Sequence, residues 1–206
     1  MHSLTRSHSP IDATENDPPR TAGGFSEDTA QVSYELCYTP SMEIRDATIE
    51  DAEVACEVTR RSITDLSVAD HKNNATVLAL WLSNKTRDNF AAWIAHQGNS
   101  VLVAVEQGII VGVGAPSDVG EITLNYVSPD ARFRGVSRAL LAALENRAMQ
   151  QGNSRCKLTS TETAHRFYRD SGYIDDGSSA SKFSALGHPM SKLLGRGLTN
   201  AKPQPD

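Results

Sequence analysis

The chain has 206 residues, of which 39% are hydrophobic and 22% charged, and its formal net charge at pH 7 is −5. This length and composition fit one domain with a buried core plus loose ends, and they exclude a dense basic nucleic-acid-binding patch. The longest apolar stretch, residues 75–82, is too short to cross a bilayer. We therefore expect no nucleic acid and no membrane as partner.

The beginning of the chain and its cysteines predict a cytoplasmic protein. Residues 1–10 lack the apolar segment of a secretory signal. Cys37, Cys56 and Cys156 are scattered and include no C-x-x-C pair, so we expect free thiols in a reducing compartment. For the same reason we expect no metal site.

Charge is distributed unevenly along the chain. Residues 42–131 carry six Lys and Arg against thirteen Asp and Glu, whereas residues 132–195 carry ten against five. An acidic half followed by a basic half suggests two ligands of opposite charge that meet in one domain. Ordinary variation of surface charge explains the same pattern and remains open.

Three segments are predicted. Residues 1–41 are rich in Ser, Thr, Pro, Asp and Gly without an apolar period, so we expect a disordered tail, or a start upstream of the true initiator at Met42. Residues 42–195 form the ordered domain, and residues 196–206 form a second disordered tail.

The elements of this domain follow from hydrophobic periodicity and from turn and cap residues. With the helices 75–83 and 87–96 counted as one helical pair, their order is β-α-α-β-β-β-α-β-α-β-β, which predicts a single-domain α/β (α+β) fold. We expect a mixed central sheet of about six to seven strands with helices on both faces. The predicted strands are 42–46, 101–105, 109–113, 120–127, 157–160 and two within 173–186 and 189–194, and the predicted helices are 48–66, 75–83, 87–96, 134–151 and 161–171.

The turn between residues 127 and 136 is the strongest candidate site. A strand ends at Val127 and a helix begins near Gly135, so unpaired N–H groups and the positive end of the helix dipole face the turn. Arg132, Arg134 and Arg138 add positive charge, which suits a diphosphate. The turn is neither a Walker loop nor a GxGxxG fingerprint. A basic helix N-terminus on a solvated surface is the alternative.

The segment Arg132-Phe133-Arg134-Gly135-Val136-Ser137 resembles the [Gln/Arg]-x-x-Gly-x-[Gly/Ala] motif of the GNAT superfamily of N-acetyltransferases, with Ser137 as its one departure. MEIRDATIEDAE resembles the opening strand and helix of that family. TAHRFYRDSGY resembles its late helix, and GHPMSKLL its closing strand. The resemblance covers nearly all of residues 42–195.

The resemblance implies that acetyl-CoA lies between two splayed parallel strands, 120–127 and 157–160. It implies that the backbone of Tyr126, Val127 and Ser128 pairs with the pantetheine, and that the Val127 N–H polarises the thioester carbonyl. The pyrophosphate would then be held by the segment that comprises Arg132, Phe133, Arg134, Gly135, Val136, Ser137 and Arg138.

Acyl transfer to an amine needs a base for the ammonium and an acid for the thiolate. Tyr168 is the candidate acid, because the family often places a tyrosine near the sulfur; a packing role is the alternative. Glu121, fourteen residues before Gly135, is the candidate base, acting directly or through water, and an exposed strand-end carboxylate is the alternative. Asn125 and Tyr126 are expected to shape the acceptor site.

We therefore expect an acetyl-CoA-dependent N-acetyltransferase that modifies a primary amine of a small molecule or protein by direct attack in a ternary complex. The acidic residues 42–131 weakly favour a cationic acceptor. A non-catalytic acyl-CoA sensor with the same fold is the alternative, and a homodimer is one option for assembly.

Overall fold

The structure, a computed structural model, describes residues 42–177, 180–182 and 185–195, all of which belong to one unit of the chain, Tyr38–Asp206. The tails predicted at 1–41 and 196–206 lie outside the described residues, so the predicted domain limits remain predictions. No helix among the described residues is long and apolar enough to span a bilayer.

The observed elements follow the predicted order closely. The short helix α2 and the 3-10 turns η1 and η2 are additions that the sequence did not predict. In chain order the elements are β1 Met42–Asp46, η1 Ile49–Asp51, α1 Ala52–Leu66, α2 Val68–His71, α3 Ala75–Leu82, α4 Arg87–Ala95, β2 Leu102–Glu106, β3 Ile109–Pro116, β4 Ile122–Val127, η2 Pro129–Ala131, α5 Val136–Gln150, β5 Arg155–Ser160, α6 Glu162–Asp170, β6 Ile174–Asp175, β7 Ala180–Lys182 and β8 Ala185–Leu193.

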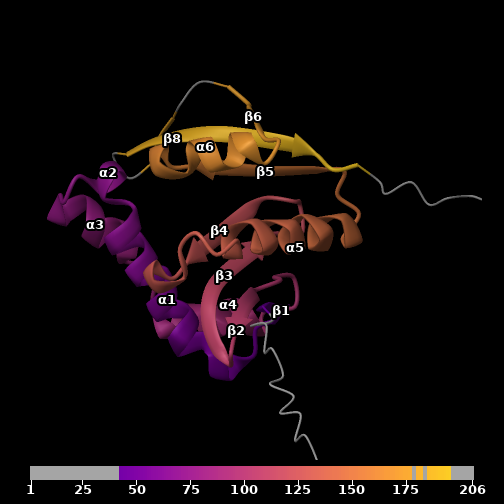
Figure 1. Ribbon diagram of the computed structural model, residues 1–206, viewed down its shortest axis with the longest axis horizontal. Helices are drawn as coiled ribbons and strands as arrows, with labels where there is room; N and C mark the ends of the chain where they lie inside the picture. Colours follow the sequence, from indigo (N-terminus) through magenta and orange to yellow (C-terminus); the bar gives the residue numbers. More distant parts are fainter. Residues whose placement is uncertain (1–41, 178–179, 183–184, 196–206) are drawn as a thin grey trace, which may run out of the picture. The chain divides into compact units, whose positions relative to one another are not determined.

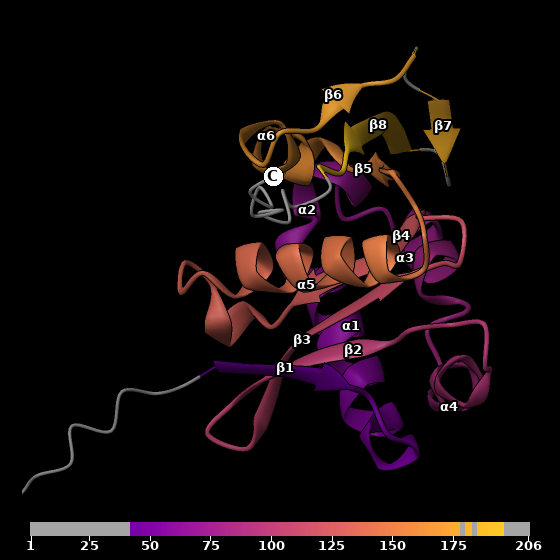
Figure 2. The same ribbon diagram turned by 90° about the vertical axis from the view of Figure 1, so that its right-hand side faces the viewer.

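The strands form two sheets rather than one. The first has the order β1-β2-β3-β4 and is antiparallel throughout, and the second has the order β5-β8-β6, with β7 also paired to β8. Figures 1 and 2 show β4 and β5 as neighbours at the border of the two sheets. Among the described residues, one parallel bridge, between Glu121 just before β4 and Lys157 in β5, joins them. The mixed α/β fold is confirmed, whereas the described residues contain eight strands, more than the six or seven predicted.

The closing strands differ from the prediction in where they break. The prediction placed one strand within 173–186 and the next within 189–194, but β8 runs from Ala185 to Leu193 without interruption. Its pairing with β5, which extends from Ser160 opposite His188 to Arg155 opposite Leu193, holds the strand extended. The chain turns earlier instead, around the short strands β6 and β7.

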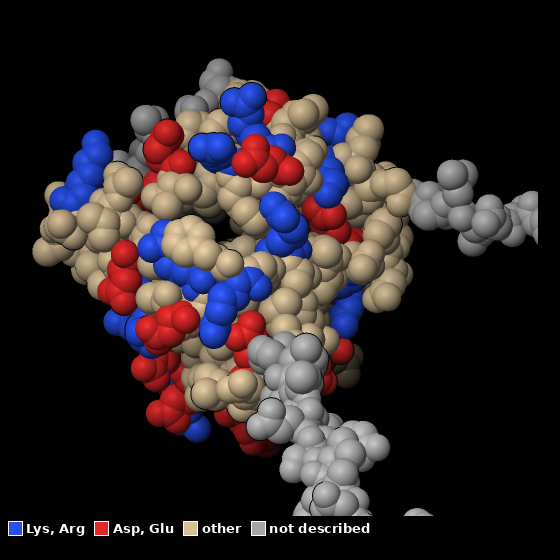
Figure 3. All heavy atoms as spheres, in the orientation of Figure 1, with Lys and Arg blue, Asp and Glu red and all other residues tan. Residues whose placement is uncertain are grey.

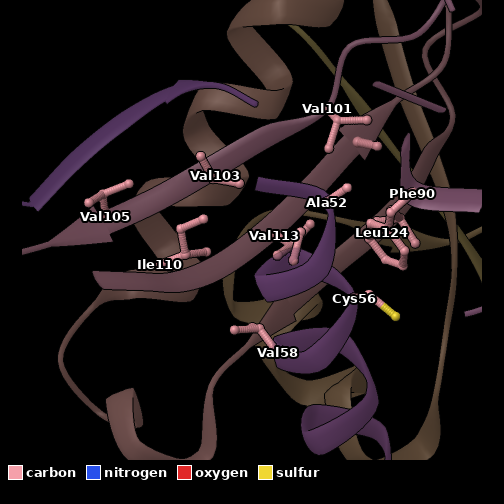
Figure 4. Close-up of a cluster of buried hydrophobic side chains, with 12 residues drawn as sticks. Ala52, Cys56, Val58, Phe90, Val101, Val103, Val105, Ile110, Val113 and Leu124 are labelled. Carbon is pink, nitrogen blue, oxygen red and sulfur yellow. The ribbon is translucent and has the colours of Figure 1, made fainter. Parts of the chain in front are cut away.

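Helices cover both faces of the first sheet. On one face α1 and α4 enclose a cluster that includes Phe90, Val103 and Val113 (Figure 4). On the other face α5 packs closely on β3, because Gly114 has no side chain: a Cβ there would lie 2.8 Å from Leu144 Cδ1. This close approach fixes the position of the helix whose first turn belongs to the candidate site.

A β-bulge interrupts β4 near its beginning. Leu124 pairs with Ala115 while Ile122 pairs with Pro116, so Thr123 is an extra residue in the ladder. In a regular strand Ile122 and Leu124 would face the same side. Here Leu124 packs in the cluster under α1 and α4, and Ile122 packs in the cluster that α5, β5 and α6 share. The bulge therefore changes the direction of the side chains at the site.

The 3-10 turn η1, which leads into α1, is held by a charged cap. The Asp51 carboxylate accepts a hydrogen bond from the Thr48 N–H at 2.7 Å and forms an ion pair with Arg45 at 2.6 Å. The hydrogen bond from Arg45 lowers the pKa of Asp51 to about 2. Arg45 in β1 thus reinforces the cap that Asp51 forms with Thr48.

Candidate active site

Two cavities meet where β4 and β5 run past each other. The first, here called the aromatic cavity, has a volume of about 420 Å³. The second, here called the arginine cavity, has a volume of about 630 Å³ and lies against the start of α5. Five residues line both cavities: Thr123, Tyr126, Thr159, Ser160 and Thr161.

The backbone of β4 presents hydrogen-bonding groups to this region. The Ser128 N–H donates to the Val111 carbonyl, which makes Val127 and Gly112 a non-hydrogen-bonded pair in the antiparallel ladder. The N–H and C=O of Val127 therefore point away from β3, towards β5. Among the described residues, β5 pairs with β4 only at the Glu121–Lys157 bridge. An extended ligand beside Val127 would find both backbone groups available.

The first turn of α5 is open to an anion. Its N-cap residue, Gly135, has φ of +83° and offers no side-chain cap, and a Cβ at that position would meet nothing within 4 Å. The preceding Phe133 also has positive φ, +61°, and its side chain is 94% exposed. Val136 is buried and anchors the turn. The unpaired N–H groups at this helix end thus face accessible space.

The arginines of the turn divide into two groups. Arg132 and Arg138 line the arginine cavity, whereas Arg134 forms an ion pair with Glu106 at 2.9 Å and does not line it. The Arg132 guanidinium lies 4.7 Å from the centre of the Phe133 ring. Figure 3 shows Lys and Arg side chains gathered around a hollow near the start of α5, below α6. Of the predicted pyrophosphate residues, only Arg134 has a side chain directed elsewhere.

Tyr168 and Asn125 are brought together across the arginine cavity. The Asn125 Nδ2 donates a hydrogen bond to the Tyr168 hydroxyl at 3.1 Å, and both residues line the cavity. Burial raises the pKa of Tyr168 to about 12, although the hydrogen bond from Asn125 partly opposes this shift. The hydroxyl is therefore protonated at neutral pH, and its own proton is available for another acceptor.

Glu121 stands apart from these residues. It is exposed at the start of β4, and its backbone N–H donates to Ser117 Oγ at 3.1 Å. Its side chain lines neither cavity. The structure thus brings Tyr168, Asn125, Tyr126 and Val127 together without Glu121, whose role as base stays a prediction.

The aromatic cavity lies between the strands β3, β4 and β5, which supply much of its wall, and the region of α3 and α4. Trp81, Trp93 and Tyr126 supply the aromatic rings. Burial raises the pKa of Tyr126, and a hydrogen bond with Trp81 offsets part of that effect. Lys85 is the one charged side chain among the described residues that line this cavity; its Nζ lies 2.7 Å from Asn84 Oδ1. The described residues that line this cavity include no Asp or Glu, and the expectation of a cationic acceptor stays a prediction.

Asp70 in α2 is a contributor that the sequence did not reveal. Its carboxylate accepts hydrogen bonds from the Glu162 N–H at 2.8 Å and the Thr163 hydroxyl at 2.5 Å, and so caps the start of α6. Thr161 caps the same helix through the Ala164 N–H, as predicted. Asp70 lies 92 residues from Glu162, so no local pattern could indicate the contact.

The comparisons agree with this architecture. The family model described as the acetyltransferase (GNAT) domain matches residues 67–194, and the chain therefore belongs to the GNAT acetyltransferase family. The comparison with curated proteins found no match.

Several solved structures share the fold. A GCN5-related N-acetyltransferase from Rhodopseudomonas palustris is 27% identical, with a TM-score of 0.66 over 76% of this chain and 96% of that one. PaiA N-acetyltransferase from Thermoplasma acidophilum, in complex with coenzyme A, is 19% identical, with a TM-score of 0.64 over 74% and 99%. YncA from Salmonella typhimurium, with acetyl-CoA, is 24% identical, with a TM-score of 0.59 over 81% and 98%.

Proposed function

We propose that the chain transfers the acetyl group of acetyl-CoA to a primary amine by direct attack within a ternary complex. Acetyl-CoA occupies the arginine cavity and the amine enters through the aromatic cavity. The observation that carries this proposal is the junction of the two cavities at β4, where Val127 directs a free backbone edge towards β5. Two compounds can meet there from opposite sides.

Binding of acetyl-CoA follows from the groups that face the arginine cavity. The pyrophosphate accepts hydrogen bonds from the first N–H groups of α5 and is neutralised by Arg132 and Arg138. The pantetheine arm extends beside Val127 like an added strand, between β4 and β5 where they diverge past their single bridge. The bound coenzyme A of PaiA and the bound acetyl-CoA of YncA support this choice of ligand.

The chemistry requires one bond to form and one to break. The amine nitrogen attacks the thioester carbonyl, and the Val127 N–H stabilises the negative charge that develops on its oxygen. The C–S bond then breaks, and Tyr168 donates its hydroxyl proton to the departing thiolate. The nitrogen loses one proton as the amide forms, and that proton returns to the tyrosinate through water. Asn125 fixes the hydroxyl through its Nδ2 donor and stabilises the resulting tyrosinate.

The acceptor must lose a proton before it attacks. The apolar rings of Trp81 and Trp93 disfavour the charged ammonium, so the aromatic cavity lowers the pKa of a bound amine. This favours an acceptor with an apolar or aromatic body and a neutral amine. Glu121, outside the cavity, remains the predicted base through intervening water.

The test separates the arginines by their contacts. Coenzyme A affinity is measured by calorimetry, and thiol release is followed with acetyl-CoA and a panel of aromatic, aliphatic and cationic primary amines. We expect Arg132→Ala and Arg138→Ala each to weaken binding about 10- to 100-fold, since charged hydrogen bonds contribute roughly 1.5–3 kcal/mol. Arg134→Ala is the matched control and should change affinity less than about threefold, because its side chain pairs with Glu106.

Three results would count against the proposal. Absence of coenzyme A binding would exclude the assigned ligand. Equal losses in all three arginine variants would show that the cavity does not select Arg132 and Arg138. Binding without thiol release across the panel would favour the non-catalytic sensor.

A further inference from the structure

A cluster of metal-binding side chain types lies in the second sheet, outside both cavities. His165 on α6, Asp175 on β6 and His188 on β8 form it, and we call it the histidine cluster. The possible ligand atoms of the three residues all lie within 4.8 Å of one another. The two imidazole rings are 4.4 Å apart between centres, and His165 Nε2 lies 2.7 Å from Asp175 Oδ1.

The fold places the histidine cluster through three separate elements. β6 pairs with β8, with Asp175 opposite Met190, two residues beyond His188. α6 lies beside both strands (Figures 1 and 2). Glu162, one helical turn before His165 on α6, contacts one member of the cluster: its Oε2 lies 2.8 Å from His188 Nε2. Two imidazoles and one carboxylate therefore converge from one helix and two strands, with a second carboxylate beside one of the imidazoles.

We propose that the histidine cluster binds a divalent first-row transition metal ion of the zinc class, with Glu162 as a fourth ligand. Imidazole nitrogen and carboxylate oxygen are ligands that Zn²⁺ takes at about 2.0–2.2 Å. Tetrahedral coordination at that length sets ligand atoms roughly 3.3 Å apart, which side-chain rotation can reach from the observed spacing. The imidazole side chains are 21% and 18% exposed, so an ion can enter from solvent without unfolding.

The site goes beyond the proposed acyl transfer, because none of its members lines either cavity. A bound ion would link α6 to the strands β6 and β8. α6 also carries Tyr168, one turn after His165, so a bound ion would hold in place the helix that positions the proposed acid. In the absence of metal, hydrogen bonds between each imidazole and a carboxylate take the place of that connection.

The direct test is a titration of the full chain with ZnCl₂, followed by calorimetry and thermal unfolding. We expect one saturable site, and at a hundredfold excess over Kd we expect Tm to rise by roughly 5–10 °C. His165→Gln and His188→Gln should each weaken binding at least tenfold. His96→Gln, at an exposed position outside the cluster, is the matched control and should bind like the wild type. Co²⁺ in place of zinc should give the visible spectrum of four-coordinate nitrogen and oxygen ligation.

Amide hydrogen exchange on the wild type keeps the test independent of how the variants fold. Zinc should slow exchange in α6 and β6 and leave α4 unchanged. The proposal is overturned if no saturable binding occurs, if zinc binds equally to the variant that lacks both His165 and His188, or if protection appears only outside α6, β6 and β8. Loss of binding in His96→Gln would also refute the assignment.

Discussion

Replacing Tyr168 by phenylalanine removes one hydroxyl from the wall of the arginine cavity and leaves the ring in place. If that hydroxyl protonates the departing thiolate, its loss should lower kcat by about 10²–10⁴-fold, the usual contribution of a positioned general acid. At about 1.36 kcal/mol for each factor of ten, the transition state loses roughly 2.7–5.5 kcal/mol. The KM for acetyl-CoA should hardly change, because its pyrophosphate is held elsewhere.

The substitution also has a cost in stability that the structure lets us estimate. The buried Asn125 Nδ2 loses its hydrogen-bond acceptor, which lies at 3.1 Å. This loss should lower the free energy of unfolding by about 1–2 kcal/mol and Tm by roughly 2–8 °C. Since burial raises the pKa of Tyr168 to about 12, the folded state favours the neutral phenol. That stability is fully present below about pH 10 and is lost as pH rises towards about 12. Tyr168→Phe should remove this alkaline dependence.

The assay is thiol release at saturating acetyl-CoA between pH 6 and pH 9, with circular dichroism to verify folding. Tyr173→Phe is the control: it removes another buried tyrosine hydroxyl, one that lines neither cavity. We expect it to retain kcat within about threefold. A kcat for Tyr168→Phe that equals the control would refute the assignment of Tyr168 as acid and leave it a packing residue.

Three further variants test other contacts. Asp51→Asn should lower the free energy of unfolding by about 1–2 kcal/mol at pH 7, because the Asp51 pKa of about 2 reflects the ion pair with Arg45. In denaturant titrations, the difference in unfolding free energy between variant and wild type should vanish as pH falls from about 4 to about 2. Asp70→Ala should lower the free energy of unfolding by about 1 kcal/mol and speed amide hydrogen exchange at the start of α6. The control Asp88→Ala, on α4, should not change exchange at α6. Glu121→Gln tests the predicted base: if this carboxylate takes the amine proton through water, kcat/KM should fall about a hundredfold and the acidic limb of the pH profile should flatten. A loss of less than about tenfold would leave Glu121 an exposed carboxylate that lines neither cavity.

Sequence patterns predicted the elements well where local chemistry decides them. Thr161 marked the beginning of α6 because its hydroxyl caps the neighbouring Ala164 N–H, and residues 134–151 showed a helical period that α5 follows. The predicted break between residues 186 and 189 was wrong, because β8 is continuous there: Gly187 pairs with β7 and Pro189 with β5, and no local pattern indicates these pairings.

The candidate site was predictable only in part, because some of its features depend on contacts between distant segments. The charged turn before α5 lies within one short segment, so its composition alone indicated an anion site. The direction of the Arg134 side chain depends on Glu106, in another strand, and no spacing in the sequence encodes that pair. The bulge at Thr123 likewise arises from the register of β4 against β3, which a periodicity of two cannot reveal.

The single bridge between Glu121 and Lys157 has a consequence for how long the protein survives in a cell. With so few backbone bonds between the two sheets, the unliganded chain opens locally at β4 and β5 more readily than within either sheet, and proteases act on such open states. A bound acyl donor between β4 and β5 would add backbone hydrogen bonds to both strands and so reduce this local opening. The lifetime of the protein should therefore follow the supply of its acyl donor, so that a starved cell degrades an acetyltransferase for which it has little substrate.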